Sequence, residues 1–406
     1  MKKVLIMGGG AAGIMAAVSA ANQGKRVFLF ERNEKLGKKI YLTGKGRCNI
    51  TNNIDMEHFF DFIPRNPKFM YSALNALSNA QLINFFEKNG LKLKVERGNR
   101  VFPASNKSSD VIKFFNNYLL DKNVKIHLNT RIKDLIVENN MVKGIKTDKD
   151  IILGDAVIIA TGGLSYPSTG STGDGYTMAK KYGHSIVKTE PALVPIETKE
   201  SFVGQLKGLT LKNIELSAHR DSKVIYRQLG ELLFTHFGIS GPLVLTLSSI
   251  ATTHQLKNAL LLLDLKPGLT HEQLDKRLQR DLAKNINKQI GNALFDLLPK
   301  RIIPIILQRA GIMENIKVNQ ISRSQRKNIV ENIKGLSLTF LRKRPIEEAV
   351  ITRGGISIKD IKSSTMESKI ITNLYFAGEI IDVDGLTGGF NLQIAFSTGY
   401  LAGLHC

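Results

Sequence analysis

The pattern of apolar and polar residues predicts an α/β fold at the two ends of the chain. Near the N-terminus, an uninterrupted apolar run at 4–7 is followed by a glycine-rich turn and a helix of small residues from Ala11 to about Asn22. A second apolar run follows at 27–30. Short apolar runs without alternation are typical of strands buried in a parallel sheet. We therefore predict a Rossmann-like parallel sheet that begins at the N-terminus.

The next hundred residues alternate between helical and extended patterns. Helical spacing appears at 56–63, 69–77, 81–89 and 109–120, and extended patterns appear at 91–96, 124–128, 131–138 and 141–147. Asn139 and Asn140 separate the last two extended segments, and asparagine tolerates the left-handed conformation that a tight hairpin turn requires. The pattern predicts a small antiparallel layer in addition to the parallel sheet.

The middle of the chain has a different pattern. Extended runs at 211–220, 223–228, 260–265 and 336–342 enclose a helical block at 271–333. We interpret residues 191–345 as an inserted domain of β-barrel character, with a helical subdomain at about 270–333. The α/β domain would then consist of residues 1–190 and 346–406.

The glycine-rich turn has the spacing of a dinucleotide-binding motif. Gly8 permits the tight turn, Gly10 lets a pyrophosphate approach the backbone, and Gly13 lets the helix pack closely on the strand. Glu31 lies 18 residues after Gly13, where its carboxylate can accept hydrogen bonds from ribose hydroxyls and repel a 2′-phosphate. A turn that binds nothing is the alternative, but the strand and helix around this turn favour a dinucleotide other than NADP.

Two later segments favour FAD over NAD. A strand at 155–160 runs into a Thr-Gly-Gly turn, and a strand at 374–377 ends at Gly378 and Glu379. A glycine-rich loop then leads from Asp382 into an apolar helix. In flavoproteins with a glutathione-reductase-like domain, the late acid holds the ribitol chain and the next helix directs its positive N-terminus at the flavin. A simple NAD dehydrogenase needs neither element, so we predict FAD.

Five motifs resemble the BaiN/RdsA family of FAD-dependent oxidoreductases. They are TGKGRCNITN at 43–52, RVFP at 100–103, GLSYP at 163–167, GDG at 173–175 and PALVP at 191–195. The resemblance extends over the whole chain and implies an FAD domain split by a large insertion, with reductase or oxidase chemistry. Members of the family are assigned to uridine reduction in large-subunit ribosomal RNA, bile-acid dehydroxylation and aminoacetone oxidation, so the resemblance leaves the substrate open.

The motifs and the resemblance together define the expected cofactor site. The first turn of the helix after Gly10 would bind the phosphates, and Ile132 would present its backbone to the adenine. The sequence contains no second strand–glycine turn–helix unit, so NAD(P)H would act only as a transient electron donor at the flavin. The expected FAD contacts are Gly8, Gly10, Ala11, Ala12, Gly13, Glu31, Arg32, Lys38, Lys39, Gly44, Gly46, Arg47, Cys48, Asn49, Ile132, Thr161, Gly162, Gly378, Glu379, Asp382, Gly389, Phe390, Asn391 and Leu392.

Composition excludes several classes of protein. No apolar run approaches 20 residues, and the first strand begins close to the N-terminus, so we expect neither a membrane span nor a signal peptide. The two cysteines form no CxxC motif and the eight histidines have no ligand spacing, which predicts no metal site and a reducing cytoplasmic location.

The formal net charge is +22, and the excess is unevenly distributed. Residues 300–344 contain eleven Lys and Arg against two Glu, and a second basic cluster lies at 35–47. Solvated helix faces in a lysine-rich protein would explain the first cluster. Binding of the FAD pyrophosphate would explain part of the second cluster. A polyanion such as ribosomal RNA explains both, whereas the cation aminoacetone would be repelled. Arg342, Lys343 and Arg344 are the expected RNA contacts.

Cys48 is the candidate proton donor. Lys45 and Arg47 flank it and would lower the pKa of its thiol. Unrelated dihydrouridine synthases use a cysteine to donate the proton when the uracil double bond is reduced. A packing role for Cys48 is the alternative. Tyr166 could donate the proton instead, or stack on the isoalloxazine.

The leading hypothesis is an FAD-dependent reductase that forms dihydrouridine in ribosomal RNA. The alternatives are a flavin oxidoreductase acting on a steroid, an amine or another metabolite, and a non-catalytic flavoprotein that binds RNA or ribosomes. The modified nucleotide, the electron donor and the oligomeric state stay open.

Overall fold

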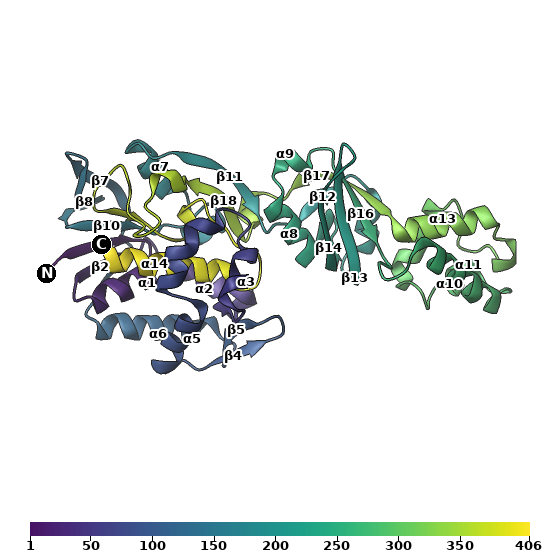
Figure 1. Cartoon of the computed structure of the whole chain (residues 1–406), viewed down its shortest axis with the longest axis horizontal. Helices are drawn as coiled ribbons and strands as arrows, with labels where there is room; N and C mark the ends of the chain where they lie inside the picture. The colour runs from purple at the N-terminus through teal and green to yellow at the C-terminus, as the bar shows by residue number, and fades with distance from the viewer. The chain divides into compact units, whose positions relative to one another are not determined.

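The computed structural model describes residues 1–406, which form two compact units (Figure 1). Unit 1 comprises Met1–Ala192 and Pro345–Cys406, and unit 2 comprises Leu193–Arg344. Each unit has its own hydrophobic core. The expected fold class, a Rossmann-like domain with an inserted barrel-like domain, is confirmed.

The centre of unit 1 is a five-stranded parallel sheet. Its strand order is β19-β10-β1-β2-β6, and every neighbouring pair is parallel. Because the apolar runs of β1 and β10 are covered on both faces, nearly all their side chains are buried. The strands are β1 (Lys3–Met7), β2 (Arg26–Phe30), β6 (Lys125–His127), β10 (Ala156–Ile159) and β19 (Leu374–Phe376).

Helices α1 (Ala11–Asn22) and α14 (Phe390–His405) pack against each other on this sheet, and Figure 1 shows α14 in yellow alongside α1. Gly399 makes the close crossing feasible, because a Cβ atom there would lie 2.9 Å from the carbonyl carbon of Ala12. Thr398 also accepts a hydrogen bond from the backbone N–H of Gly378, which follows β19 (2.9 Å). None of the helices combines enough length and apolar character to cross a membrane.

Small antiparallel layers surround the parallel sheet. In the predicted hairpin, Asn139 and Asn140 have φ angles of 49° and 56°, which confirms the turn. Strand β11 (Ile186–Ala192) pairs with β18 (Ile351–Ile356), so the segments of unit 1 before and after the insertion are joined directly. The other strands are β3 (Thr51–Asn52), β4 (Leu93–Glu96), β5 (Arg100–Pro103), β7 (Ile132–Glu138), β8 (Met141–Thr147) and β9 (Ile151–Leu153).

The remaining helices of unit 1 follow the predicted segments closely, with two breaks. The expected helix at 56–63 is divided into α3 (Met56–Phe59) and a 3₁₀ turn at Phe60–Phe62. The expected helix at 69–77 is divided into a 3₁₀ turn at Pro67–Met70 and α4 (Tyr71–Ala76). Phe86, Phe115 and Phe396 are fully buried and contact one another, which attaches α5 and α6 to α14. The other helices are α2 (Lys38–Leu42), α3 (Met56–Phe59), α5 (Asn79–Lys88), α6 (Ser108–Asp121) and α7 (Asp174–Lys181).

Unit 2 contains a closed six-stranded barrel with the order β12-β15-β14-β13-β16-β17. The predicted strand at 223–228 is too short, because β14 continues to Phe234 and buries Leu232 and Phe234 in the barrel core. The strands are β12 (Ile196–Thr198), β13 (Thr210–Arg220), β14 (Lys223–Phe234), β15 (Gly238–Ser240), β16 (Leu260–Asp264) and β17 (Leu336–Lys343), and α8 (Pro242–Ile250) and α9 (Thr253–Leu256) lie between β15 and β16.

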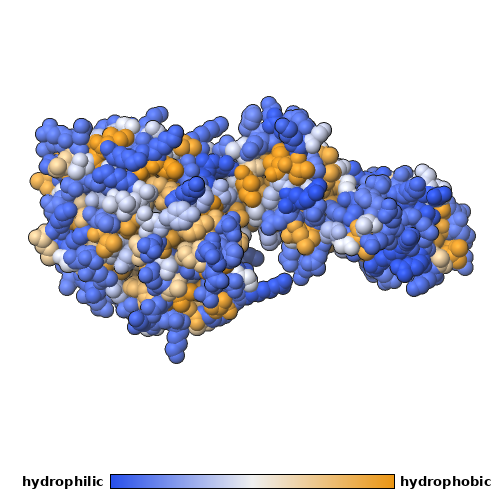
Figure 2. Space-filling view, in the orientation of Figure 1, coloured by the Kyte–Doolittle hydropathy of each residue, from blue (hydrophilic) through white to orange (hydrophobic).

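A helical subdomain is inserted between β16 and β17. Thr270 and Ser322 form capping boxes that start its two longest helices. Arg326 binds Asp275 (2.7 Å) and connects these helices. The helices are α10 (His271–Lys284), α11 (Ile290–Ala293), α12 (Ile303–Arg309) and α13 (Arg323–Lys334). Figure 2 shows a mostly hydrophilic surface over them.

We predict that Gly399→Ala destabilises unit 1. The added methyl group would lie 2.9–3.0 Å from two backbone atoms of Ala12, so the helices must separate. Overpacking of this kind costs about 1–3 kcal/mol, and it outweighs the better helix propensity of alanine. The measurement is urea unfolding, with Gly268→Ala as the control because a Cβ atom there meets no atom within 4 Å. Equal midpoints for the two variants would contradict the close crossing.

Candidate functional site

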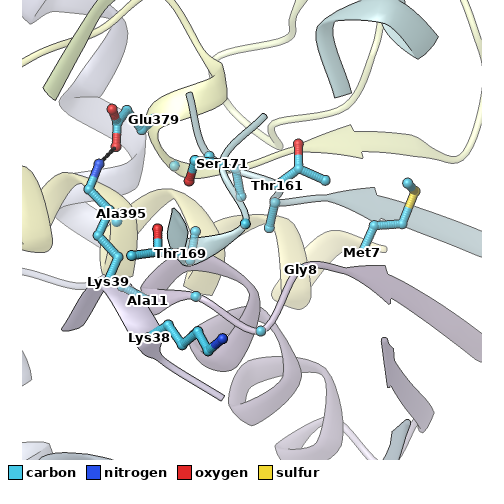
Figure 3. Close-up of a pocket in the computed structure, with 18 of the residues that line it drawn as sticks. Met7, Gly8, Ala11, Lys38, Lys39, Thr161, Thr169, Ser171, Glu379 and Ala395 are labelled. Atoms are coloured by element: carbon cyan, nitrogen blue, oxygen red, sulfur yellow. Dashed lines mark hydrogen bonds and ion pairs between the residues drawn. The ribbon is translucent and has the colours of Figure 1, made fainter. Parts of the chain in front are cut away.

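Unit 1 contains a large pocket at the carboxyl ends of β1, β10 and β19, with an empty volume of about 1400 Å³ including its open mouth. The N-terminal turns of α1 and α14 both contribute to its lining (Figure 3). In open α/β sheets, ligands bind at this edge because the helix N-termini meet there. The pocket is therefore the candidate cofactor site.

Fifteen of the expected FAD contacts line this pocket. They come from segments that are far apart in the sequence, as the motifs at both ends of the chain predicted. They are Gly8, Gly10, Ala11, Ala12, Glu31, Arg32, Lys38, Lys39, Ile132, Thr161, Gly162, Gly378, Glu379, Asn391 and Leu392.

Nine of the expected contacts lie outside the lining. Gly13 supports the turn by packing on the carbonyl of Gly8. Arg47 pairs with Glu96 and lies over the ring of Phe102. Phe390 stacks on Phe62 at 4.4 Å between ring centroids. The others are Gly44, Gly46, Cys48, Asn49, Asp382 and Gly389.

One end of the pocket is formed by the glycine turn and Glu31. The backbone N–H groups of Gly9 and Asn33 donate to the two carboxylate oxygens of Glu31 (2.8 and 2.9 Å). These bonds hold the buried carboxylate against the turn. Gly10 has no atom within 4 Å of a Cβ position, so a ligand can approach its backbone. The first N–H groups of α1 lack intrahelical acceptors and have no side-chain cap, which suits a pyrophosphate.

Sequence reasoning missed an ion-pair cluster beside this end. Arg131 binds both carboxylate oxygens of Asp174 (2.8 and 3.0 Å), and Arg32 lies 3.4 Å from the same carboxylate. Burial opposes ionisation, but hydrogen bonds from Arg131 and Thr172 outweigh it and lower the pKa of Asp174. All four residues line the pocket. The GDG motif containing Asp174 was the available signal.

At the opposite end, Glu379 connects several chain segments. Its carboxylate pairs with Lys39 and accepts hydrogen bonds from the Ser165 hydroxyl and the Thr352 N–H (both 2.7 Å). Figure 3 shows the Lys39–Glu379 contact as a dashed line. Burial raises the pKa of Glu379, but Lys39 and these hydrogen bonds lower it by more, so the group stays ionised. Glu379 thus presents a fixed negative charge to the pocket.

The loop before α14 is held by two aspartates. Arg65 binds Asp382 (2.8 Å) and lies 3.5 Å from Asp384. Asp384 lines the pocket but was not among the expected contacts, whereas Asp382 was expected and lies outside it. Asn391 accepts from the N–H of Gly385 (2.9 Å) and donates to its carbonyl (2.7 Å). These contacts fix the N-terminus of α14 at the pocket, where its positive end favours negative charge.

The expected lowering of the Cys48 thiol pKa is wrong. Cys48 is fully buried, and burial raises the pKa of its thiol to about 12. Its backbone is left-handed (φ 60°), and the neighbouring Arg47 is bound to Glu96 and Asn106. The flanking cations therefore do not stabilise a thiolate.

Tyr166 is half-buried and lies beside the ammonium of Lys39, 5.7 Å from its ring centroid. It does not line the pocket itself, although Lys39 does. Burial and the negative charge of Glu379 raise the pKa of Tyr166. The phenol therefore keeps its proton at neutral pH.

The expected RNA contacts at 342–344 are mostly engaged within unit 2. Lys343 is buried and donates to the carbonyl of Ser248 (2.6 Å). Arg342 and Arg344 bind the two carboxylate oxygens of Glu197 (2.8 and 2.6 Å). Lys343 is thus excluded as an RNA contact, and of the two arginines only Arg342 keeps most of its side chain exposed (67%).

The pocket meets the requirements of FAD. Two helix N-termini, the open backbone at Gly10 and the carboxylate of Glu31 in the lining suit a dinucleotide whose flavin becomes anionic on reduction. Thr161 also lines the pocket, and its buried hydroxyl has no hydrogen-bond partner within the protein. A buried hydroxyl without a partner is costly unless a ligand or water satisfies it.

Comparison with known proteins matches nearly the whole chain. The HI0933-like protein Rossmann domain family matches residues 2–405. The chain is 31% identical to the 3-dehydro-bile acid delta(4,6)-reductase of Clostridium scindens, covering 99% of this chain and 98% of that protein. It is also 31% identical to the ribosomal RNA dihydrouridine synthase of Haemophilus influenzae, covering 98% of this chain and 97% of that protein.

Among solved structures, the chain is similar to 3-ketosteroid-delta4-(5alpha)-dehydrogenase from Rhodococcus jostii RHA1. The TM-score is 0.53 at 14% identity, with 100% of this chain and 96% of that chain covered. At this identity, the likeness extends to the fold alone.

We predict that Glu31→Arg abolishes FAD binding. The long cation would occupy the ribose end of the pocket and remove the acceptor for the Gly9 and Asn33 N–H groups. Binding is measured by FAD fluorescence quenching and by the flavin absorbance of the purified protein. Glu87→Arg, an exposed site on α5, makes the same charge change and should bind FAD normally. Unchanged affinity in Glu31→Arg would contradict this placement of the ribose.

Proposed function

Because the chain belongs to the HI0933-like family, the FAD-dependent BaiN/RdsA oxidoreductases, we propose that it reduces uridine to dihydrouridine in large-subunit ribosomal RNA. Support comes from relatives named ribosomal RNA dihydrouridine synthase, at 31% and 28% identity over almost the whole chain. The net charge of +22 is the observation that favours this substrate, because a polyanion is attracted to such a protein at long range. The proposed location is the cytoplasm, where ribosomal RNA is accessible.

A second candidate function is reduction of an unsaturated steroid-like acid. The relative named 3-dehydro-bile acid delta(4,6)-reductase is as similar to the chain as the first dihydrouridine synthase. Such a substrate carries a single negative charge and gives no reason for the large positive excess. We therefore rank it second.

The residues of the pocket would divide the binding of FAD between them. The first turn of α1 would bind the pyrophosphate, and Glu31 would accept from the ribose hydroxyls. The ribitol and flavin would lie towards Glu379, Lys39 and the N-terminus of α14. When bound, FAD supplies the hydride for reduction of a carbon–carbon double bond. NAD(P)H would be a transient electron donor, because the fold contains a single dinucleotide-binding unit.

Reduction of the uracil C5=C6 bond also needs a proton at the carbon that does not receive hydride. We propose Tyr166 as its donor, since its raised pKa keeps the phenol protonated and Lys39 connects it to the pocket. Cys48 also keeps its proton but has no exposed surface from which to deliver it. Lys39 would position Tyr166 through its contact with the ring.

The test of the proposed function is the dihydrouridine content of ribosomal RNA. Deletion of the gene should remove dihydrouridine from large-subunit RNA, as detected by nuclease digestion and mass spectrometry. The wild-type gene should restore it, and the Glu31→Arg gene should not, which excludes a non-catalytic binding role. Unchanged dihydrouridine in the deletion strain would refute the proposal. Turnover of an unsaturated 3-oxo bile acid by the purified protein would then support the second candidate.

We predict that Tyr166→Phe lowers the rate of product formation by roughly 10²–10⁴-fold, the usual contribution of a general acid. The measurement is single-turnover oxidation, by substrate, of enzyme reduced beforehand, with FAD binding checked separately. Tyr71→Phe removes the hydroxyl of an exposed tyrosine and is the matched control. Cys48→Ala should retain the wild-type rate. A lower rate of product formation in Cys48→Ala, with an unchanged rate in Tyr166→Phe, would identify the thiol as the proton donor.

A further inference from the structure

Helix α10 of the helical subdomain carries a row of cations on its outward face. Leu274, Leu278 and Leu282 recur at every fourth position and are buried. Because a helix turns once in 3.6 residues, side chains two residues beyond these positions lie on the opposite face. Those positions are occupied by Lys276, Arg280 and Lys284, and all three are exposed.

Arg277 extends the row, and we call the four residues Lys276, Arg277, Arg280 and Lys284 the α10 stripe. Lys276, Arg277 and Arg280 border a surface hollow together with Gln273, Gln279 and the partly buried Leu269. From Lys276 to Lys284 the stripe is about 12 Å long, at 1.5 Å per residue. The exposed face of α10 contains no large apolar side chain, and Figure 2 shows this part of unit 2 as strongly hydrophilic.

The chain leaves the stripe largely unneutralised. Lys276, Arg280 and Lys284 form no hydrogen bond or ion pair with the rest of the protein, and only Arg277 has a carboxylate within 4 Å, that of Asp281 at 3.6 Å. The exposed Glu272 lies one turn before Lys276 without forming an ion pair with it. Neighbouring cations differ, since Arg326 and Lys334 are paired with Asp275 (2.7 Å) and Asp264 (2.5 Å).

This arrangement is unfavourable for the helix itself. Lys276, Arg280 and Lys284 follow one another at i,i+4, where like charges repel and weaken a helix. Burial and the charge of Arg277 together lower the pKa of the adjacent Lys266, as expected in a locally positive field. The stripe therefore gains little from contacts within the chain, and the charges of Lys276, Arg280 and Lys284 are available to a ligand.

We propose that the α10 stripe binds the phosphate backbone of RNA. The inference rests on the proposed function, because it assigns a surface to the proposed substrate. A row of cations at intervals of about 6 Å fits a ligand with closely repeated charge, and the two glutamine amides can donate to phosphate or sugar oxygens. A lipid surface would require apolar side chains beside the cations for insertion, and this face has none that are large and exposed.

The test compares RNA binding by the full-length protein and a triple variant, Lys276→Gln/Arg280→Gln/Lys284→Gln. The probe is an in vitro transcript of large-subunit ribosomal RNA, titrated at several salt concentrations. The plot of log affinity against log salt should become shallower by about two to three units, because each lost phosphate contact removes about one. At about 0.1 M salt the affinity should fall roughly 10- to 100-fold.

The matched control is Lys88→Gln/Lys92→Gln/Lys113→Gln, which removes three positive charges from exposed sites of unit 1. It should keep both the affinity and the slope of the wild type. A charge-conserving variant, Lys276→Arg/Lys284→Arg, should also bind as the wild type does. The thermal midpoint of the triple glutamine variant should not fall, because the substitutions relieve repulsion along the helix.

The proposal would be overturned if the triple glutamine variant kept the affinity and the salt slope of the wild type. It would also be overturned if the control variant lost as much affinity and slope as the triple glutamine variant. These outcomes are separate from those of the dihydrouridine test, since binding requires neither FAD nor turnover. Stripe-dependent binding without dihydrouridine formation would refute the proposed reaction and leave the RNA surface standing. If the protein forms dihydrouridine but its RNA binding is unchanged in the triple glutamine variant, the proposed reaction is supported and the α10 stripe is excluded as the RNA surface.

Discussion

The close crossing of α1 and α14 is the constraint on which the pocket depends. At Gly399 and Gly403, α14 has no side chain facing α1, so the backbones of the two helices approach closely at these positions. Each helix begins just beyond the carboxyl edge of the parallel sheet, α1 after β1 and α14 after β19 and its loop. Their crossing therefore brings two positive helix ends to one pocket, although nearly the whole chain separates them in sequence. A single helix end would suit a phosphate, whereas two suit a ligand with negative charge at two separate points.

The fold was predictable where local pattern determines it. The helix from Ala11, the buried strands of the parallel sheet and the Asn139–Asn140 turn each depend on residues within a short window. The barrel was less predictable, because β12 and β15 have three residues each and are specified by closure between β17 and β14. Likewise, β14 extends to Phe234 because the barrel core accepts its apolar side chains.

In the candidate site, too, the sequence predicted which segments contribute but not the contacts between them. Motif spacing identified the segments that supply the glycine turn, Glu31, Glu379 and the start of α14. It could not reveal that Glu379 is bound by Lys39, Ser165 and Thr352, because these come from three other segments. It also misjudged Cys48, since adjacent residues in a left-handed turn point in different directions and desolvation then controls the thiol pKa.

The positive charge of unit 2 illustrates why a charge count along the sequence does not locate a binding surface. The run at 342–344 belongs to β17, where Lys343 is buried and its two arginine neighbours bind Glu197. In α10 the cations are interspersed with glutamine, leucine and aspartate, so the sequence shows no comparable run. The helical period nevertheless gathers them on one face, away from most carboxylates. Attraction of a polyanion depends on charge that the protein leaves unneutralised at its surface, and by that criterion α10 contributes more than the denser run in β17.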